Sequence, residues 1–341
     1  MAALIFRYAS RWRNLRYHIR NAPWDELHAY ERQRSGRSWL PWRDLLLAAW
    51  RHGASFDDYY LLRFFEKSRA QRREYLTLSL YYELERQKNR LDKAMILRDK
   101  ARFARHFRDL LGRRVWTWEE LCRLDADERP PDRLVIKNRW GVRGRGIHFP
   151  EQRFPDWAAV RAHVAETVER PEHYLCEAYV HQHPLLAALN PGTVNTLRVV
   201  TWQAGGQVSV WGTILRVGRG RGPDNWARGG LAAWVDDDGT ISRLAVPKNP
   251  FEAHVETHAD SRLPITGLSI PGIDEIRRLA IESANRLPEV QSIGWDIALG
   301  QDGPCLIEGN DRWSHQLLQA TLGHGCRHLA DAVGEMHQVY E

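Results

Sequence analysis

The sequence predicts an α+β protein in which a mostly helical N-terminal region precedes two lobes of mixed helix and sheet. Residues 74–111 are rich in Leu, Arg, Lys and Glu, a composition typical of helix. Strand-like apolar runs begin at Leu134 and then alternate with helical segments. A chain of 341 residues is long enough for two domains. We therefore expect a basic helical region at 1–114, a first lobe at 115–175 and a second lobe at 176–341.

The individual elements follow from apolar periodicity and from start signals. Pro41 is suited to open a helix, and the apolar residues after it recur at helical spacing on one face. These residues are Trp42, Leu45, Leu46, Ala49 and Trp50. Further helices are expected at 56–67, 156–168 and 273–287. Strands are expected at 134–137, 174–180, 197–202, 208–217 and 231–235.

A hairpin near the C-terminus carries the most informative polar residues. The runs Gly294–Ala298 and Leu306–Asn310 flank Asp302-Gly303, a dipeptide that favours a tight turn. Glu308 and Asn310 are two residues apart, so they face the same side of their strand and can approach Asp296 on the other. Mg²⁺ binds one or two carboxylates together with substrate phosphates. The pattern predicts a Mg²⁺ site; a solvated turn is the alternative.

A basic, glycine-rich loop follows the strand that ends at Lys137. The loop contains Gly141, Gly144 and Gly146 and leads into a second apolar run. Glycines let backbone N–H groups approach a phosphate, and a lysine beside them adds positive charge. The pattern is not a Walker A loop, which needs Gly-Lys-Ser/Thr at the start of a helix. We expect phosphate binding here; a simple turn is the alternative.

Together these motifs resemble the ATP-grasp superfamily, in its sugar-transfer-associated branch, which is related to α-L-glutamate ligases. The resemblance rests on the strand with Lys137, the glycine-rich loop, the segment Glu177-Ala178-Tyr179-Val180 and the final acidic hairpin. Four further segments extend the similarity from Leu97 to the C-terminus. They are 97–103, 190–198, 224–230 and 264–267.

The resemblance implies an ATP-grasp fold, in which two α+β lobes clamp ATP. It implies that Lys100 and Lys137 hold phosphates and that the loop from Gly141 to Gly146 closes over them. The hinge from Glu177 to Val180 would read adenine, and the acidic hairpin would bind Mg²⁺. One departure is the stretch His181-Gln182-His183-Pro184, which offers no acidic residue to the ribose.

The implied reaction is an ATP-dependent ligation of a carboxylate to an amine or a similar nucleophile. ATP would phosphorylate the carboxylate, and the nucleophile would attack the acyl phosphate to form a C–N bond, with release of ADP and phosphate. The branch name suggests glycan, polysaccharide or natural-product biosynthesis. One alternative is a kinase of a small molecule or sugar. Another is a protein that binds a membrane or an anionic polymer and keeps a vestigial ATP site.

Five further residues are candidates for catalysis. Arg198 and Arg216 lie in apolar strand-like runs, where a guanidinium must be paired because burying it alone is costly. Each could hold the γ-phosphate or a substrate carboxylate, and a structural ion pair is the alternative; Asn195 could support either role. The glycine-rich loop 219–230 carries the remaining two candidates, Asp224 and Asn225. The next residue, Trp226, could shield the site from water.

Charge is distributed unevenly along the chain. Residues 1–114 hold 26 basic and 13 acidic residues, a net charge of +13, although the whole chain carries only +6. This excess suggests an anionic surface or polymer as a partner of the N-terminal region. The alternative is a solvated helical face whose aromatics pack on the catalytic body. Nucleic acid is not expected as the partner.

Composition also bears on the compartment. No run approaches 18 apolar residues, and the N-terminus lacks a signal-peptide core. The four cysteines are widely spaced, which fits a reducing compartment and argues against a structural zinc site. We expect a cytoplasmic protein that could lie at the inner face of the membrane through its basic N-terminus.

Overall fold

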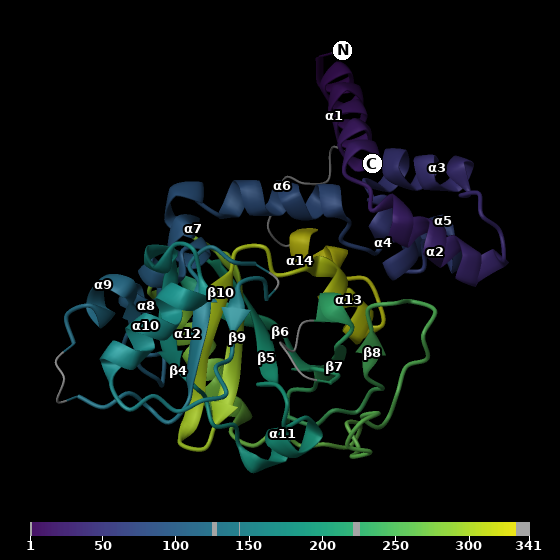
Figure 1. Ribbon diagram of the computed structural model, residues 1–341. Coiled ribbons are helices and arrows are strands. Elements are labelled where there is room, and N and C mark those ends of the chain that lie inside the picture. The colour runs from purple at the N-terminus through teal and green to yellow at the C-terminus, as the bar shows by residue number, and fades with distance from the viewer. Residues whose placement is uncertain (1, 125–127, 143, 221–225, 332–341) are drawn as a thin grey trace.

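Helices alone make up the N-terminal part of the computed structural model, which describes residues 2–124, 128–142, 144–220 and 226–331 (Figure 1). The early helices are α1 (Ala2–Arg20), α2 (Trp24–Ser35), α3 (Trp42–His52), α4 (Phe56–Leu61), η1 (Phe64–Glu66) and α5 (Arg69–Arg73). Three more follow, α6 (Leu78–Lys88), α7 (Leu91–Arg98) and α8 (Lys100–His106). The helix expected at 56–67 ends early, because Arg63 adopts the left-handed conformation with φ of 51°.

A small antiparallel sheet forms the first lobe, with the strand order β1-β4-β2-β3. Its strands are β1 (Val115–Thr117), β2 (Leu134–Asn138), β3 (Ile147–His148) and β4 (Tyr174–Ala178), so the sheet continues past residue 175. Helices α9 (Trp118–Leu121) and α10 (Trp157–Thr167) and the short η2 (Pro171–His173) belong to the same lobe. Trp116 and Trp157 pack against each other in its core, with ring centroids 4.7 Å apart.

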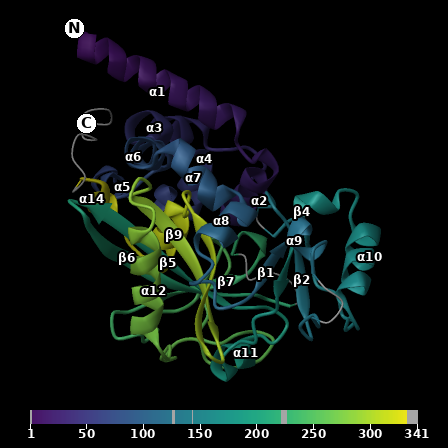
Figure 2. The same cartoon turned by 90° about the vertical axis from the view of Figure 1, so that its left-hand side faces the viewer.

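A six-stranded antiparallel sheet forms the second lobe, in the order β10-β9-β5-β6-β7-β8. Its strands are β5 (Thr196–Ala204), β6 (Gln207–Val217), β7 (Leu231–Val235), β8 (Val246–Pro247), β9 (Ser292–Gly300) and β10 (Gly303–Asn310). The remaining helices are α11 (Pro184–Leu189), η3 (Trp226–Arg228), α12 (Ile273–Asn285), α13 (His315–Leu322) and α14 (Arg327–Asp331). The turned view separates the two sheets clearly (Figure 2).

The two faces of the large sheet have different neighbours. Leu197, Val199 and Trp295 point into a core completed by α12, α7 and α8. Side chains alternate along a strand, so Arg198 and Asp296 lie on the opposite face. Helices α6 and α13 cover part of that opposite face. The polar site therefore occupies the portion of the sheet that these two helices leave.

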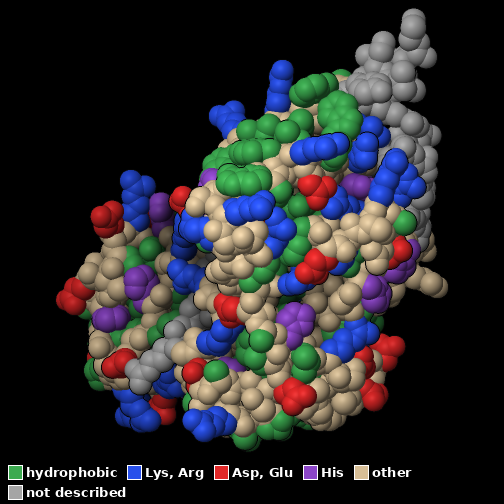
Figure 3. Space-filling view, turned by 90° about the vertical axis from the view of Figure 1, so that its right-hand side faces the viewer, with side chains coloured by type: hydrophobic (Ala, Val, Ile, Leu, Met, Phe, Trp, Pro, Cys, Tyr) green, Lys and Arg blue, Asp and Glu red, His purple; other side chains and the backbone are tan. Residues whose placement is uncertain are grey.

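The face that α3 buries differs from the expected one. Leu45, Ala48 and Ala49 are buried, whereas Trp42 is 46% exposed. The buried side faces α4 and the rest of the N-terminal helices. The face predicted from the sequence is rotated about the helix axis by part of a turn from the face that is buried. Figure 3 shows hydrophobic side chains gathered in the upper part of the face that bears these helices, among Lys and Arg side chains.

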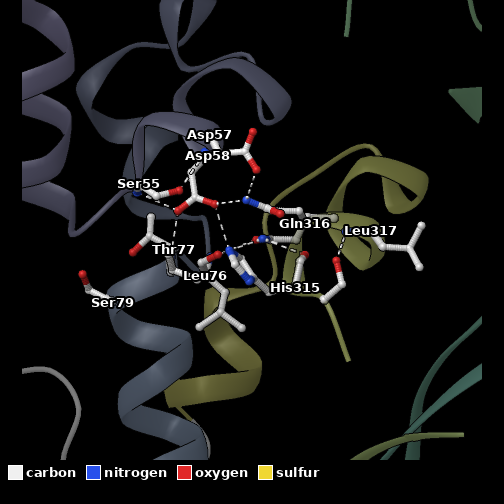
Figure 4. Close-up of polar contacts among 12 residues, drawn as sticks. Ser55, Asp57, Asp58, Leu76, Thr77, Ser79, His315, Gln316 and Leu317 are labelled. Atoms are coloured by element: carbon white, nitrogen blue, oxygen red, sulfur yellow. Dashed lines mark hydrogen bonds and ion pairs between the residues drawn. The ribbon is translucent and has the colours of Figure 1, made fainter. Parts of the chain in front are cut away.

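A buried polar cluster joins the N-terminal helices to α13 (Figure 4). Asp58 accepts hydrogen bonds from His315 Nε2 at 2.9 Å and from Gln316 Nε2 at 2.7 Å. Asp58 also forms a capping box with Ser55, and its Oδ2 accepts from the backbone N–H of Leu78 at 2.8 Å. Helices α4, α6 and α13 are thus tied together by one fully buried carboxylate.

Among the described helices, none combines the length and the apolar character needed to cross a bilayer.

Candidate active site

The acidic hairpin forms as β9 and β10, with Gly300 paired to Gly303 across a two-residue turn. The turn residues are therefore Gln301 and Asp302, and Gly303, with φ of 122°, begins β10. An irregularity between Leu306 and Glu308 inserts one residue, so that Glu308 pairs with Asp296. Without this bulge Glu308 would point toward the core.

The three predicted metal ligands are brought together. The carboxylate of Glu308 lies in hydrogen-bond contact with that of Asp296, and Asn310 Nδ2 is 3.5 Å from Glu308 Oε1. Burial and the neighbouring Asp296 raise the pKa of Glu308, an effect that the positive charge of Lys100 opposes. Two adjacent carboxylates need a proton or a cation between them.

Two arginines hold Asp296 on the floor of the site. Arg198 pairs with both of its oxygens, and Arg216 Nη2 lies 3.0 Å from Oδ2. Although burial raises the pKa of Asp296, these two guanidinium groups hold it at about 2. Arg198 also donates to the Trp313 carbonyl at 2.9 Å and is only 6% exposed. Its donors are occupied inside the protein, so Arg198 is better described as a residue that positions Asp296.

A glycine makes this arrangement sterically feasible. A Cβ on Gly294 would lie 2.4 Å from Trp313 Cβ and 2.9 Å from Arg198 Cδ. Both distances are shorter than real Cβ contacts. Gly294 therefore leaves the space in which Arg198 and Trp313 meet beside Asp296.

The second cationic group lies on the small sheet. Lys137 on β2 donates to Glu177 Oε2 at 2.8 Å, and Arg113 donates to the same oxygen at 2.7 Å. Burial raises the pKa of Glu177, but the charges of Arg113 and Lys137 hold it at about 2. Burial lowers the pKa of Lys137, and Glu177 and then Glu308 counteract that effect. The carboxylate of Glu177 thus positions Lys137, which differs from the expected contact with adenine.

The glycine-rich loop is linked to the acidic hairpin through Lys100. Lys100 Nζ donates to the Gly141 carbonyl at 2.6 Å and lies 4.0 Å from Glu308 Oε2. A Cβ on Gly141 would lie 2.3 Å from the Arg145 carbonyl oxygen, and Gly146 has a φ of 67°. Gly144 has a φ of 73°. The glycines are therefore required by the loop's own backbone.

The remaining hinge residues lie beside an apolar cluster. Val180 packs with Ala298 and Cys305, and Ile307 lies against the same cluster. The guanidinium of Arg133 lies 3.9 Å from the ring centroid of Tyr179. Beside the hairpin, the hinge therefore offers an apolar cluster around Val180 and a cationic group at Tyr179.

Four of the residues singled out from the sequence need revision or lie outside the described part of the chain. Asn195 is fully buried, and its amide bonds the carbonyl of Leu186 at 2.8 Å and the backbone N–H of Gly218 at 3.2 Å. It therefore organises the neighbouring loop and does not face the site. Asp224 and Asn225 lie outside the described residues. Trp226 does not cover the site, because it is 6% exposed and donates to the Val246 carbonyl in the core.

The donor set fits Mg²⁺. Within the ranges that the structure describes, no three His, Cys, Asp or Glu side chains are arranged as a metal site. The candidate ligands are instead two carboxylates and one amide oxygen, which are hard donors that suit Mg²⁺. The carboxylates of Glu308 and Asp296 are in contact, and like charges so close repel each other. A cation bound between them would offset this repulsion, so the contact is the observation that supports a metal there.

Sequence reasoning missed several supporting residues. Arg113 lies in a segment without a distinctive motif, and Asp99 lies in the family-like segment 97–103, but the roles of both depend on contacts across the fold. Asp99 caps α8 and pairs with Arg139 at 2.6 Å, which fixes the start of the glycine-rich loop next to Lys100. For Gly294 the sequence did offer a signal, because a glycine inside a strand-like run indicates that another group packs closely against the backbone there.

The chain is similar to several solved structures. An N5-carboxyaminoimidazole ribonucleotide synthetase from Thermotoga maritima is 12% identical, with 64% of this chain and 42% of that chain aligned and a TM-score of 0.35. A putative ATP-grasp superfamily protein from Archaeoglobus fulgidus is 14% identical, with 76% and 62% aligned and a TM-score of 0.41. An L-amino acid ligase from Bacillus licheniformis is 14% identical, with 64% and 41% aligned and a TM-score of 0.37. The aligned part thus spans between 41% and 62% of these three proteins.

No curated protein sequence matches the chain. A family model described as sugar-transfer associated ATP-grasp matches residues 120–335, which is more than half of the chain. The fold of two antiparallel sheets behind a helical N-terminal region agrees with the one that the sequence motifs implied. The chain therefore belongs to the sugar-transfer-associated ATP-grasp family.

Proposed function

We propose that the chain is an ATP- and Mg²⁺-dependent ligase that activates a carboxylate as an acyl phosphate and joins it to an amine. The observation that carries this proposal is the contact series from the glycine-rich loop to the acidic hairpin. Lys100 contacts Gly141 and approaches Glu308, which touches Asp296. Cations and carboxylates from both lobes therefore meet at one place, as phosphoryl transfer requires.

The cationic side of the site is suited to phosphate. Lys100 and Lys137 approach Glu308 from the N-terminal helices and from the small sheet. Phosphate oxygens can replace the Gly141 carbonyl as partners of Lys100, since an anion is the stronger acceptor. Glu177 and Arg113 keep Lys137 in place, so its ammonium is positioned before the nucleotide arrives.

The acidic side would hold the metal. Glu308, Asp296 and the amide oxygen of Asn310 are the proposed ligands. Mg²⁺ would neutralise charge on the β- and γ-phosphates and so favour attack on phosphorus. Arg198 and Arg216 keep Asp296 ionised and oriented for that role. Arg216, on the surface of the sheet beside Thr196, also adds positive charge where the phosphoryl group would move.

The adenine would lie against the hinge. We propose that Tyr179 and Val180 border the base together with Ile307 and the apolar cluster of Ala298 and Cys305. The ring would gain from burial against these side chains.

The proposed reaction has two steps. A carboxylate oxygen of the substrate attacks the γ-phosphorus of ATP, the bond to the β-phosphate oxygen breaks, and ADP leaves. The amine nitrogen then attacks the carbonyl carbon, phosphate leaves, and the amine loses a proton. The family's description associates it with sugar transfer, so amino sugars belong among the nucleophiles to be tested.

The decisive experiment measures ADP release with a panel of carboxylic acids and amines, followed by mass spectrometry of the products. Hydroxylamine should trap the acyl phosphate as a hydroxamate when the correct acid is present, even without the natural amine. A stable phosphoester without hydroxamate would identify a kinase instead. Formation of AMP and pyrophosphate would refute the ligase assignment.

A further inference from the structure

A partly exposed apolar stripe runs along α3. Trp42, Leu46 and Trp50 recur every four residues, so they share one face of the helix. Trp42 is 46% exposed, and Trp39, just before the helix, is 61% exposed. The opposite face of α3 is buried among the N-terminal helices. Leu46 and Trp50 are partly buried against this same core, so the stripe on α3 is open to solvent mainly at Trp42.

Helix α1 extends this stripe. Trp12, which is 55% exposed, packs its edge against Trp50 with ring centroids 5.1 Å apart. Farther along the helix, Tyr17 and Ile19 are 43% and 41% exposed. The alternative, in which the α1 aromatics pack on the catalytic body, does not hold for Trp12, which contacts α3, whereas the Tyr17 ring packs against Tyr82 of α6 with centroids 6.1 Å apart. Large apolar side chains that gather on a surface mark a site of interaction.

The surface around the stripe is strongly basic. Residues 1–24 contain five arginines and no acidic residue. Arg13 and Arg16 line a shallow hollow beside Trp12, together with Ala9. The guanidinium of Arg37 lies 5.0 Å from the ring centroid of Trp39. Aromatic and cationic side chains therefore alternate over the same surface.

We propose that this stripe docks the protein on the surface of an anionic lipid bilayer. Trp and Tyr favour the membrane–water interface, where the ring is half buried and half hydrated. Arginines next to them attract anionic head groups. The proposed association is peripheral, with the aromatic side chains at the level of the head groups.

A lipid surface fits better than two other partners. Single-stranded nucleic acid needs open aromatic faces for stacking, but the Trp12 and Trp50 rings meet at 71°, with the edge of one ring against the face of the other. The exposed Ile19 has no use in base stacking, yet it partitions into a bilayer. A second copy of the chain would bring two arginine-rich surfaces together, which like charges oppose.

The test uses the full chain and co-sedimentation with vesicles of phosphatidylcholine alone or mixed with phosphatidylglycerol. Two double variants alter the surface: Arg16→Ala with Arg20→Ala, and Trp12→Ser with Trp39→Ser. The matched controls are Arg153→Ala and Leu263→Ser, which change exposed side chains elsewhere. Because every altered side chain is exposed, thermal melts should match the wild type.

Wild-type protein should bind the vesicles that contain phosphatidylglycerol and show little binding to phosphatidylcholine alone. The arginine variant should bind about 25-fold more weakly, since each of the two basic residues near the surface contributes about fivefold. The tryptophan variant should bind at least about tenfold more weakly through lost interfacial burial. Both controls should bind as the wild type does.

Three outcomes would overturn the proposal. One is equal binding of wild type and both variants. Another is binding to heparin or single-stranded DNA, lost in the tryptophan variant, without binding to vesicles. The third is a concentration-dependent dimer in light scattering that the tryptophan variant abolishes. Nucleotide binding to the active site is measured in parallel, and it should be unchanged in all four variants, so the two proposals can fail separately.

Discussion

Gly294→Ala tests whether the packing beneath Asp296 sets the geometry of the site. The new Cβ would lie 2.4 Å from Trp313 Cβ and 2.9 Å from Arg198 Cδ, so at least one of these side chains must move. Trp313 is fully buried, and its Nε1 donates to Ser292 Oγ at 2.7 Å, which resists its displacement. The more mobile partner is Arg198, and its shift would loosen the pairing with Asp296.

The size of the effect follows from two opposing terms. Overpacking of a tight core costs about 1–3 kcal/mol. Replacing glycine by alanine returns about 0.4–1 kcal/mol through the unfolded chain, because the glycine has an ordinary φ and alanine tolerates it. We expect the free energy of unfolding to fall by about 1–2 kcal/mol. A displacement near 1 Å at reacting groups lowers turnover by roughly a hundredfold.

Two assays separate these effects. Urea unfolding followed by tryptophan fluorescence gives the stability, and calorimetric titration with ADP and Mg²⁺ gives the effect on the site. Gly300→Ala on the same strand is the matched control, because the nearest atoms to its Cβ would be Gly303 O at 3.1 Å, Cys305 Sγ at 3.3 Å and His181 O at 3.6 Å, all longer than the contacts at Gly294. If Gly294→Ala matched Gly300→Ala in both stability and Mg²⁺-dependent ADP affinity, the assigned role of Gly294 would be wrong.

Three further predictions follow. Glu308→Gln should abolish turnover and Mg²⁺-dependent ADP binding while the melting temperature stays close to wild type, since one of few metal ligands is lost; wild-type turnover at saturating ATP and Mg²⁺ would contradict the metal assignment. Lys137→Ala should weaken ATP binding in calorimetry far more than Lys88→Ala on α6 does, and equal affinities would exclude Lys137 from the phosphate site. Asp57→Asn should stabilise the protein at neutral pH, because burial and the nearby Asp58 raise the pKa of Asp57 to about 6. When the pKa of a carboxyl is higher in the folded state, the free energy of unfolding falls as the pH rises from about 4 to 6, here by up to about 3 kcal/mol. Urea unfolding should therefore show equal stabilities of variant and wild type below pH 4 and a more stable variant above pH 6.

The hairpin was predictable because its signals are local. The apolar runs and the spacing of two between Glu308 and Asn310 lie within a few residues, although the turn falls one residue before the predicted dipeptide. The bulge between Leu306 and Glu308 was not predictable, since it depends on how β10 aligns with β9. The strand with Lys137 was equally local, but its partners Glu177 and Arg113 come from strand pairing and from the segment before β1.

The arginines show where local reasoning ends. An arginine in an apolar strand must be paired, and both candidates are paired with the same carboxylate, as burial demands. The sequence could not distinguish the two, although Arg198 is committed to the Trp313 carbonyl and Arg216 to Thr196. The full occupation of the Asn195 amide was also invisible, because its partners surround it only after the loop before β5 has folded.

The helical N-terminal region supports the site, and it cannot be treated as a detachable appendage. Arg198 donates to the carbonyl of Trp313, and two residues later His315 pairs with Asp58 of the N-terminal helices. Between them Ser314 adopts a φ of 69°, so this short segment is held in an uncommon conformation from both sides. Removing the helices would leave His315 and its neighbours without their buried partners and would release the carbonyl that holds Arg198. Truncation from the N-terminus would therefore disturb catalysis and membrane docking together, whereas substitutions of exposed side chains separate the two.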